Sequence, residues 1–171
     1  MRKRTSGRYG FGVWPEPVQR VADFLYAAGT EATLEEFPGG TPTAEDAANA
    51  AGVDISQIVK SLVFDCDGVA VVVMVPGDRR ADREKVAAAA GLPTARVANP
   101  EQVLAATGFE PGAVAPFPLP RVQHVLIDRT LLAHEHVWIG AGSPNHMARI
   151  RPGDLAQLAK ARQTDAVADA K

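Results

Sequence analysis

A lysine, Lys60, interrupts an apolar run that is otherwise typical of a buried β-strand. Side chains alternate between the two faces of a strand, so Lys60 shares its face with Leu62 and Phe64. The opposite face carries Val59 and Val63, so we expect both faces of this strand to be covered. A lysine in such a strand either extends its ammonium group to an edge of the sheet or serves a site that requires a fixed positive charge.

The hydrophobic periodicity of the chain, with its Gly and Pro residues, predicts helices and strands that alternate along the sequence. Helices are expected at residues 15–29, 43–52, 82–90, 99–106 and 152–159, with a short helical turn at 130–132. Strands are expected at 32–37, 58–64, 69–75, 122–127, 137–139 and 148–150, with a tight hairpin turn at 65–68. The run 69–75 is apolar on both faces, which is typical of a central strand. The pattern predicts one domain of the α/β (α+β) class around a central sheet.

The two ends of the chain differ in composition from its middle. Residues 1–13 carry four basic side chains among Ser and Gly, and we predict a flexible basic arm there. Residues 14–160 form the predicted folded domain. The Ala-, Asp- and Lys-rich residues 161–171 are predicted to form a flexible tail.

The composition, with 46% hydrophobic and 22% charged residues, is that of an ordinary globular protein. The net charge of −2 gives no global basic field, so any contact with RNA requires a local patch such as the basic residues of 79–85. The single cysteine, Cys66, excludes an internal disulfide and is compatible with a reducing compartment. No apolar run is long enough for a membrane span or a signal peptide. We therefore expect a cytoplasmic protein.

Nucleophilic and metal-dependent chemistry have little support in the sequence. Cys66 lies between two aspartates, which disfavour a thiolate. His134 and His136 could share one face of a strand, but no further ligands follow at a useful spacing. His124 and His146 are interpreted as structural or surface residues. No metal and no cofactor is predicted.

Two further segments depart from ordinary helix or strand patterns. Residues 107–117 have no periodicity, yet they are too apolar for a solvated loop. Gly112 allows close approach of the backbone and Pro116 stiffens the loop, as a pocket wall with one oriented N–H donor requires. Residues 140–147 place small side chains directly after a strand, where a ligand could approach. A packed connecting loop and a tight turn, respectively, are the alternatives.

The Lys60 strand, the 107–116 loop and the Val137–Gly142 strand end follow one another in a characteristic order and spacing. In this respect residues 15–160 resemble the YbaK-like aminoacyl-tRNA deacylases, relatives of the editing domain inserted in bacterial prolyl-tRNA synthetases. The resemblance implies a single domain with a mixed, barrel-like sheet surrounded by helices. It also implies a trans-editing hydrolase that cleaves the ester between a mischarged amino acid and the 3′ end of a tRNA, commonly the tRNA for proline.

The resemblance also implies roles for particular residues. The family's invariant lysine falls on Lys60 and the glycine of its G-x-x-x-P loop falls on Gly112, so these are the expected catalytic residues. The expected substrate-binding residues come from the two loops: Phe109, Ala113, Val114, Pro116, Gly140, Ala141 and Gly142. Gly140 stands where relatives often have serine, and residues 143–147 differ from the cysteine-specific members. The edited amino acid therefore stays open among Cys, Ala and other small residues.

An aminoacyl ester is already activated, so the protein chiefly needs to place water and stabilise an oxyanion. We expect the Gly112 N–H to donate to that oxyanion and Lys60 to hold the terminal nucleotide. The expected partner is a mischarged tRNA, with prolyl-tRNA synthetase as a further candidate. Two alternatives stay open at this point: a non-catalytic module that binds an aminoacyl group or nucleotide, and a hydrolase of a small metabolite.

Overall fold

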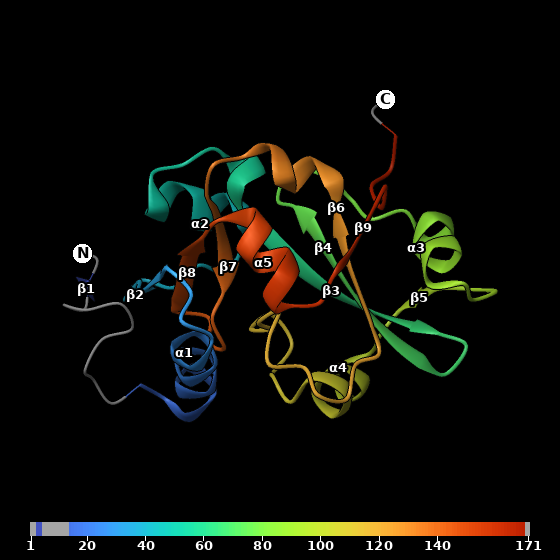
Figure 1. Ribbon diagram of the computed structural model, residues 1–171, viewed down its shortest axis with the longest axis horizontal. Helices are drawn as coiled ribbons and strands as arrows, with labels where there is room; N and C mark the ends of the chain where they lie inside the picture. Colours follow the sequence, from blue (N-terminus) through green and yellow to red (C-terminus); the bar gives the residue numbers. More distant parts are fainter. Residues whose placement is uncertain (1–2, 5–13, 170–171) are drawn as a thin grey trace.

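The structure is a computed structural model of the chain, and it describes residues 3–4 and 14–169. The described strands form two sheets (Figure 1). The four-stranded sheet has the order β1-β2-β8-β7, with β1 Lys3–Arg4, β2 Ala32–Glu36, β8 His146–Ile150 and β7 Val137–Gly140. The five-stranded sheet has the order β5-β3-β4-β6-β9, with β5 Arg96–Val97, β3 Val59–Cys66, β4 Val69–Pro76, β6 His124–Asp128 and β9 Arg162–Thr164.

The helices lie where the sequence predicts them. They are α1 Glu16–Ala28, α2 Ala44–Ala51, α3 Arg83–Ala90, α4 Pro100–Thr107 and α5 Pro152–Leu158, with short 3-10 helices at Ile55–Gln57 and Arg129–Ala133. Helices α1 to α4 each end at a glycine in the left-handed conformation, namely Gly29, Gly52, Gly91 and Gly108. This confirms the helix ends predicted from the glycines of the sequence.

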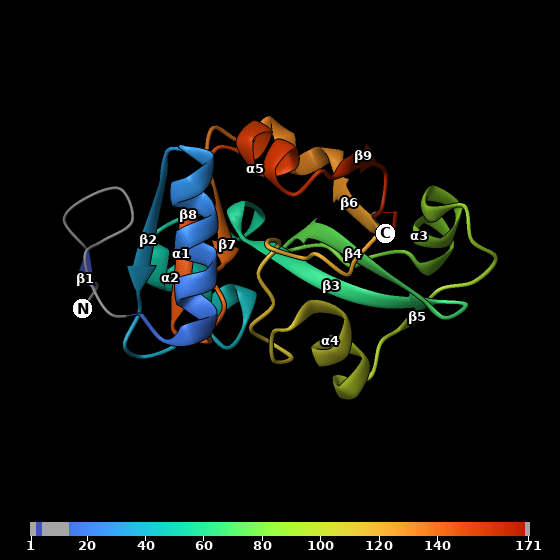
Figure 2. The ribbon, with the colours of Figure 1, turned by 60° about the horizontal axis from the view of Figure 1, so that its bottom comes forward.

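The helices cover both sheets. Helix α1 lies across one face of the four-stranded sheet (Figure 2). Helix α2 packs on the opposite face, where it forms an apolar cluster with Trp138 of β7 and Met147 of β8. Helix α3 covers one face of the five-stranded sheet, where Val86 of α3 and Phe64 of β3 belong to one apolar cluster. The main core lies between the two sheets and contains apolar residues from both of them. Helix α5 also contributes to this core.

The β3–β4 hairpin confirms the prediction made from the apolar runs and the turn between them. Asp67 and Gly68 both have positive φ, at 54° and 85°, which is the backbone conformation that an Asp-Gly hairpin turn requires. Strand β4 lies between β3 and β6, pairing antiparallel with the first and parallel with the second, so it is the predicted central strand of a mixed sheet. Val63 faces the main core and Phe64 the core under α3, so both faces of β3 are covered.

The mixed sheet and the α+β class are confirmed, whereas the barrel-like arrangement of one central sheet is not. The strands are divided between two sheets that do not close on each other, and Ile58 and Trp138 form a single isolated bridge between the segments that carry β3 and β7. The two sheets share a core but not a continuous hydrogen-bond ladder. The architecture is therefore a single α+β domain.

The structure also differs from the predicted flexible tail at 161–171. Residues 162–164 form β9, which pairs in parallel with β6, and Ala166 and Val167 are buried against the core under α3. The pairing with β6 is a long-range contact that composition does not reveal. Most of the predicted basic arm, at 1–2 and 5–13, lies outside the described residues, whereas 3–4 form β1 beside β2.

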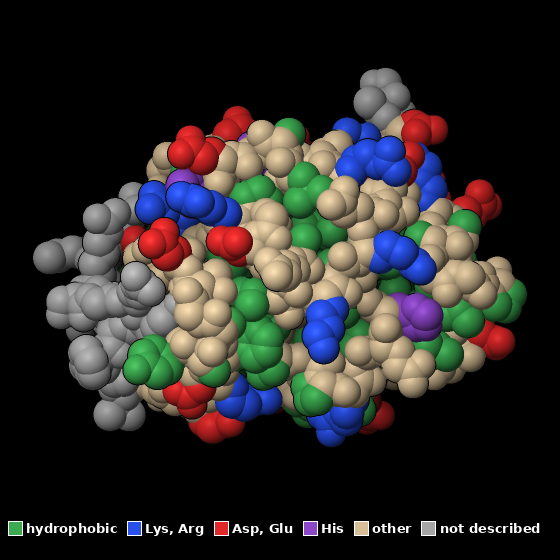
Figure 3. Space-filling view, viewed as in Figure 1, with side chains coloured by type: hydrophobic (Ala, Val, Ile, Leu, Met, Phe, Trp, Pro, Cys, Tyr) green, Lys and Arg blue, Asp and Glu red, His purple; other side chains and the backbone are tan. Residues whose placement is uncertain are grey.

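Acidic and basic side chains are interspersed on the face of the molecule shown in Figure 3, in agreement with the small net charge. Among the residues that the structure describes, no helix has the length and apolar character needed to cross a lipid bilayer.

Candidate active site

A cavity of about 420 Å³ opens where the start of β3 meets three loops. One loop precedes α2, one contains the predicted glycine–proline segment, and one connects β7 to β8. The lining residues are Thr41, Pro42, Thr43, Ala44, Ala47, Ile58, Val59, Lys60, Ser61, Leu62, Gly112, Ala113, Val114, Gly140, Ser143, Pro144, His146 and Met147. The volume is in the range of small-molecule sites.

Lys60 is half-buried at the beginning of β3 and is one of the residues that line this cavity. Its Nζ donates a hydrogen bond to the backbone carbonyl of Arg79, at 2.7 Å. Burial lowers the pKa of Lys60, the charge of Asp78 acts in the opposite direction, and Arg80 lowers the pKa further. Within the described part of the chain, no carboxylate lies within ion-pair distance of this ammonium. The direct partner of Lys60 is a neutral carbonyl, and the ammonium has further N–H donors for a ligand.

Gly112 faces the same cavity from the loop that follows α4. Its φ of +81° is unfavourable for any residue with a Cβ, so the local turn explains the glycine. The turn is closed by a hydrogen bond from the Ala113 N–H to the Glu110 carbonyl, at 3.0 Å. Among the described residues, we find no acceptor for the Gly112 N–H. This N–H is therefore a donor that a ligand in the cavity could use.

The strand-end loop after β7 approaches both the glycine–proline loop and α1. A Cβ on Gly140 would lie 3.0 Å from the Val114 carbonyl oxygen, so a larger residue there would require the two loops to move apart by a few tenths of an ångström. Gly142 has a φ of +98°, and a Cβ there would lie 2.6 Å from the Pro17 carbonyl oxygen. These contacts fix the position of the cavity wall relative to the helix.

The structure brings together five of the predicted site residues and places four elsewhere. Lys60, Gly112, Ala113, Val114 and Gly140 line the cavity. The other four do not line it: Phe109, Pro116, Ala141 and Gly142.

The reasons for these four differences are local. Phe109 is buried in the core below the loop, and the Arg20 guanidinium lies 4.8 Å from its ring centroid. Pro116 faces a separate cavity of about 360 Å³. Ala141 is fully buried, and Gly142 contacts the backbone of α1.

Sequence analysis missed a polar pair in the cavity wall. Ser143 Oγ and His146 Nδ1 share a hydrogen bond of 2.5 Å, and both residues line the cavity. His146 is only 5% exposed, and the Trp14 ring contacts it edge-on with the centroids 5.2 Å apart. Burial lowers the pKa of His146, against a smaller effect of Glu36, so the neutral imidazole is favoured. The spacing of Ser143 and His146, directly after the small-residue segment, was the available signal.

The Ser61 hydroxyl is the second polar group that the sequence did not single out. Its oxygen is buried, has no hydrogen-bond partner among the described residues, and belongs to a residue lining the cavity. Buried hydroxyl groups are normally hydrogen-bonded, so this one is an exception within the cavity wall. The described residues contain no group of three or more His, Cys, Asp or Glu side chains that could hold a metal ion.

Comparisons with known proteins agree with this geometry. A family model for the aminoacyl-tRNA editing domain matches residues 39–158. Protein YwhH of Bacillus subtilis (strain 168), described as uncharacterized, is 35% identical over 129 residues, which are 75% of this chain and 82% of YwhH. A proline–tRNA ligase of Streptomyces coelicolor is 40% identical over 78 residues, which cover 37% of this chain and 14% of the ligase.

Solved structures show the same relationship. A protein described as a proposed trans-editing enzyme for prolyl tRNA synthetase superposes with a TM-score of 0.85 at 34% identity, covering 92% of this chain and 100% of that one. The hypothetical protein APE2540 superposes with a TM-score of 0.81 at 31% identity, covering 87% of this chain and 99% of that one.

Fold, cavity and sequence matches together define an editing domain of the kind that acts on aminoacyl-tRNA. The chain belongs to the aminoacyl-tRNA editing domain family, within its YbaK-like branch. The resemblance noted in the sequence is thereby confirmed.

Proposed function

We propose that the chain is a trans-editing hydrolase that cleaves the ester bond of a mischarged tRNA. The observation that carries the proposal is the cavity that Lys60 and the Gly112 loop line together. Similarity to a segment of a proline–tRNA ligase and to a proposed trans-editing enzyme supports the tRNA for proline as the substrate. A small amino acid, Cys, Ala or Ser, is the proposed cargo.

In the proposed reaction a water molecule attacks the ester carbonyl, and the Gly112 N–H donates a hydrogen bond to the oxyanion that forms. The intermediate then expels the ribose oxygen, which takes up a proton, and the amino acid leaves as a carboxylic acid. The substrate's own ribose hydroxyl or amino group helps to activate the water, because the ester needs little further activation. Lys60 binds the phosphate or carbonyl oxygens at the tRNA end, since its charge has no carboxylate partner in the described structure.

The walls of the cavity are proposed to select the amino acid by size. Gly112, Val114 and Gly140 bring backbone and small side chains to the cavity surface, so a bulky substrate side chain would meet the wall. Steric exclusion of larger side chains is expected to be more selective than attraction, because an apolar pocket discriminates weakly between amino acids by attraction alone.

The test is a deacylation assay with the tRNA for proline carrying Cys, Ala, Ser or the correct Pro. We expect turnover of at least one mischarged tRNA and little loss of the correctly charged one. Lys60→Met, which keeps the apolar stem, is expected to lower kcat/KM about a hundredfold or more. Lys160→Met is the matched control, since Lys160 is an exposed lysine outside the cavity, and it should behave like the wild type.

The alternatives give different results in the same assay. Protection of the ester without turnover would indicate a non-catalytic module that binds an aminoacyl group. If the protein neither hydrolyses nor protects any charged tRNA but does hydrolyse small esters, it would be a metabolite hydrolase. Full activity of Lys60→Met would contradict the role given to Lys60.

A further inference from the structure

The residues after α5 form a strap that runs back along the domain to the loop between β4 and α3. We define the C-terminal strap as residues 162–169; it lies beyond the part of the chain matched by the family model. Its first part is β9, and its second part pairs with the loop through two backbone hydrogen bonds of 2.8 Å. The Asp82 N–H donates to the Ala166 carbonyl, and the Ala168 N–H donates to the Arg80 carbonyl.

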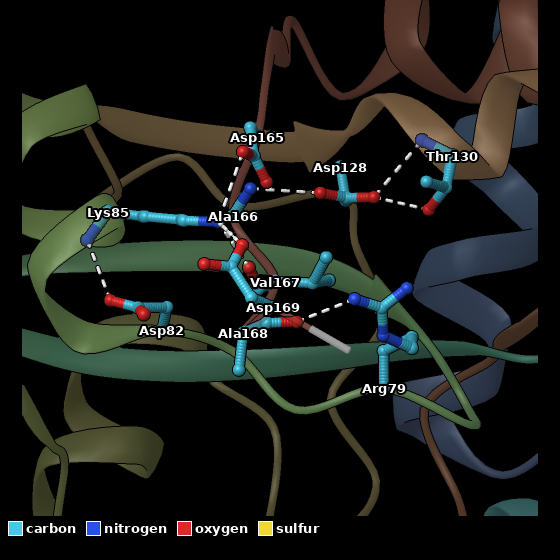
Figure 4. A network of polar contacts seen from close by, with 10 residues as sticks. All are labelled: Arg79, Asp82, Lys85, Asp128, Thr130, Asp165, Ala166, Val167, Ala168 and Asp169. Atoms are coloured by element: carbon cyan, nitrogen blue, oxygen red, sulfur yellow. Dashed lines mark hydrogen bonds and ion pairs between the residues drawn. The ribbon is translucent and has the colours of Figure 1, made fainter. Parts of the chain in front are cut away.

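Charged side chains anchor the strap from helix α3. Lys85 Nζ donates hydrogen bonds to Asp165 Oδ2 at 3.1 Å, to Asp169 Oδ1 at 3.0 Å and to the Val167 carbonyl at 2.8 Å (Figure 4). These bonds raise the pKa of Lys85 and lower the pKa of Asp169. The three acceptors of the Lys85 ammonium group therefore all belong to the strap.

The fully buried Asp128 anchors the strap from the other side. Its Oδ1 accepts a hydrogen bond of 2.9 Å from the Ala166 N–H, and its Oδ2 accepts one of 3.0 Å from the Thr130 N–H. Hydrogen bonds to a buried carboxylate are among the stronger ones in proteins. The strap is thus held by β6, by α3 and by the loop that it contacts.

The same loop holds the lysine of the candidate active site. The Arg79 side chain donates a hydrogen bond of 2.6 Å to the Ala168 carbonyl of the strap, while the Arg79 carbonyl accepts the hydrogen bond from Lys60 Nζ. We propose that the C-terminal strap is a positioning element for Lys60: by fixing the Arg79–Asp82 loop, it fixes the carbonyl that holds the lysine's ammonium group. Only the catalytic consequence of this proposal rests on the function proposed above.

The physical reason for such an element is the sensitivity of an active site to small displacements. A misplacement of about 1 Å can lower a rate by up to two orders of magnitude. A loop between a strand and a helix is among the parts of a protein that open most readily, unless other contacts hold it. The two backbone bonds, the Arg79 guanidinium and the Lys85 cluster supply those contacts here.

The test observes Lys60 directly, by NMR of ¹⁵N-lysine-labelled full-length protein. The exchange of the Lys60 ammonium protons with water is measured in the wild type and in Lys85→Met, which removes the anchors on α3. We expect exchange to become about threefold faster or more in Lys85→Met, because the Arg79 carbonyl is no longer held. Glu84→Met, at an exposed position on the same helix, is the matched control and should leave the exchange rate unchanged.

A second pair of variants breaks the strap at one backbone bond. Ala168→Pro removes the N–H that donates to Arg80, whereas Ala168→Ser keeps it. Faster exchange at Lys60 in Ala168→Pro, with wild-type exchange in Ala168→Ser, supports the proposal. Unchanged exchange in both Lys85→Met and Ala168→Pro overturns it, whatever their stability.

The deacylation assay then separates this proposal from the proposed function. If Lys60 is catalytic, kcat/KM falls about tenfold in Lys85→Met and stays near the wild-type value in Glu84→Met. Faster Lys60 exchange in a protein that deacylates no tRNA would support the strap as a positioning element and reject only the enzymatic role. Normal exchange in an active enzyme would reject the strap's role and leave the enzyme assignment intact.

Discussion

Replacing Gly142 by alanine should destabilise the domain strongly, because this residue fixes the β7–β8 loop against helix α1. The φ of Gly142 is +98°, and an added Cβ would lie 2.6 Å from the carbonyl oxygen and 2.8 Å from the carbonyl carbon of Pro17. Both atoms belong to the backbone of α1, so neither can move aside as a flexible side chain would. The strain therefore has to be taken up by the loop that carries Ser143 into the cavity wall.

The magnitude follows from two contributions. An alanine held at positive φ costs about 1–2 kcal/mol relative to glycine. Forcing a methyl group into a well-packed contact costs about 1–3 kcal/mol more. We therefore expect Gly142→Ala to lower the free energy of unfolding by about 2–5 kcal/mol, a large part of the stability of a typical domain.

Urea denaturation followed by circular dichroism measures this change, with Gly153→Ala as the matched control. Gly153 lies in α5, has no atom within 4 Å of a Cβ position and has no positive φ. The control should leave the free energy of unfolding unchanged or raise it by up to about 1 kcal/mol. A loss of less than about 1 kcal/mol in Gly142→Ala would show that the loop does not approach α1 as described.

Three further predictions concern buried polar groups. Asp128→Asn should lower the free energy of unfolding by about 2–3 kcal/mol in urea denaturation, because its amide N–H₂ must face the N–H of Ala166 or Thr130; a change below about 0.5 kcal/mol would contradict this. Burial lowers the pKa of His146 in the folded protein below the ordinary value of 6.5. As the pH falls through 6.5, the imidazole therefore binds a proton in the unfolded state before it does so in the folded state, and the wild type should lose stability in this pH range. His146→Gln should make that pH dependence shallower, and equal slopes in the two proteins would argue against a buried neutral imidazole. Burial raises the pKa of the Cys66 thiol, so native protein should react with Ellman's reagent about tenfold or more slowly than urea-unfolded protein, and equal rates would refute its burial.

The elements that sequence analysis predicted well are those encoded by neighbouring residues. The β3–β4 hairpin follows from two apolar runs and an Asp-Gly turn, and the ends of α1 to α4 follow from single glycines. The division of the strands into two sheets could not be predicted in the same way. Alternation shows which side chains face a core, whereas the Ile58–Trp138 bridge depends on which distant strand lies alongside.

The candidate site shows the same limit at the level of single residues. Lys60 and Gly112 could be selected because each departs from the pattern around it, and Gly140 because it belongs to a run of small residues after a strand. All three line the cavity. Phe109 and Pro116 belong to a loop without periodicity, so nothing in the sequence tells which of its apolar residues face the cavity and which face the core. The buried Ala166 of the strap is hidden for a related reason, because one small apolar residue in a polar tail has no local signature.

The two lysines that flank the Arg79–Asp82 loop in the sequence have different partners. Lys85 hydrogen-bonds to Asp165 and Asp169, so its charge is neutralised within the fold and serves to hold the strap. Lys60 bonds to the neutral carbonyl of Arg79, and burial lowers its pKa, although the charge of Asp78 acts in the opposite direction. Holding a charge in this way is unfavourable for stability alone. The arrangement is understandable if the compensating oxygen atoms arrive with the substrate, which agrees with the role proposed above for Lys60 at the tRNA end.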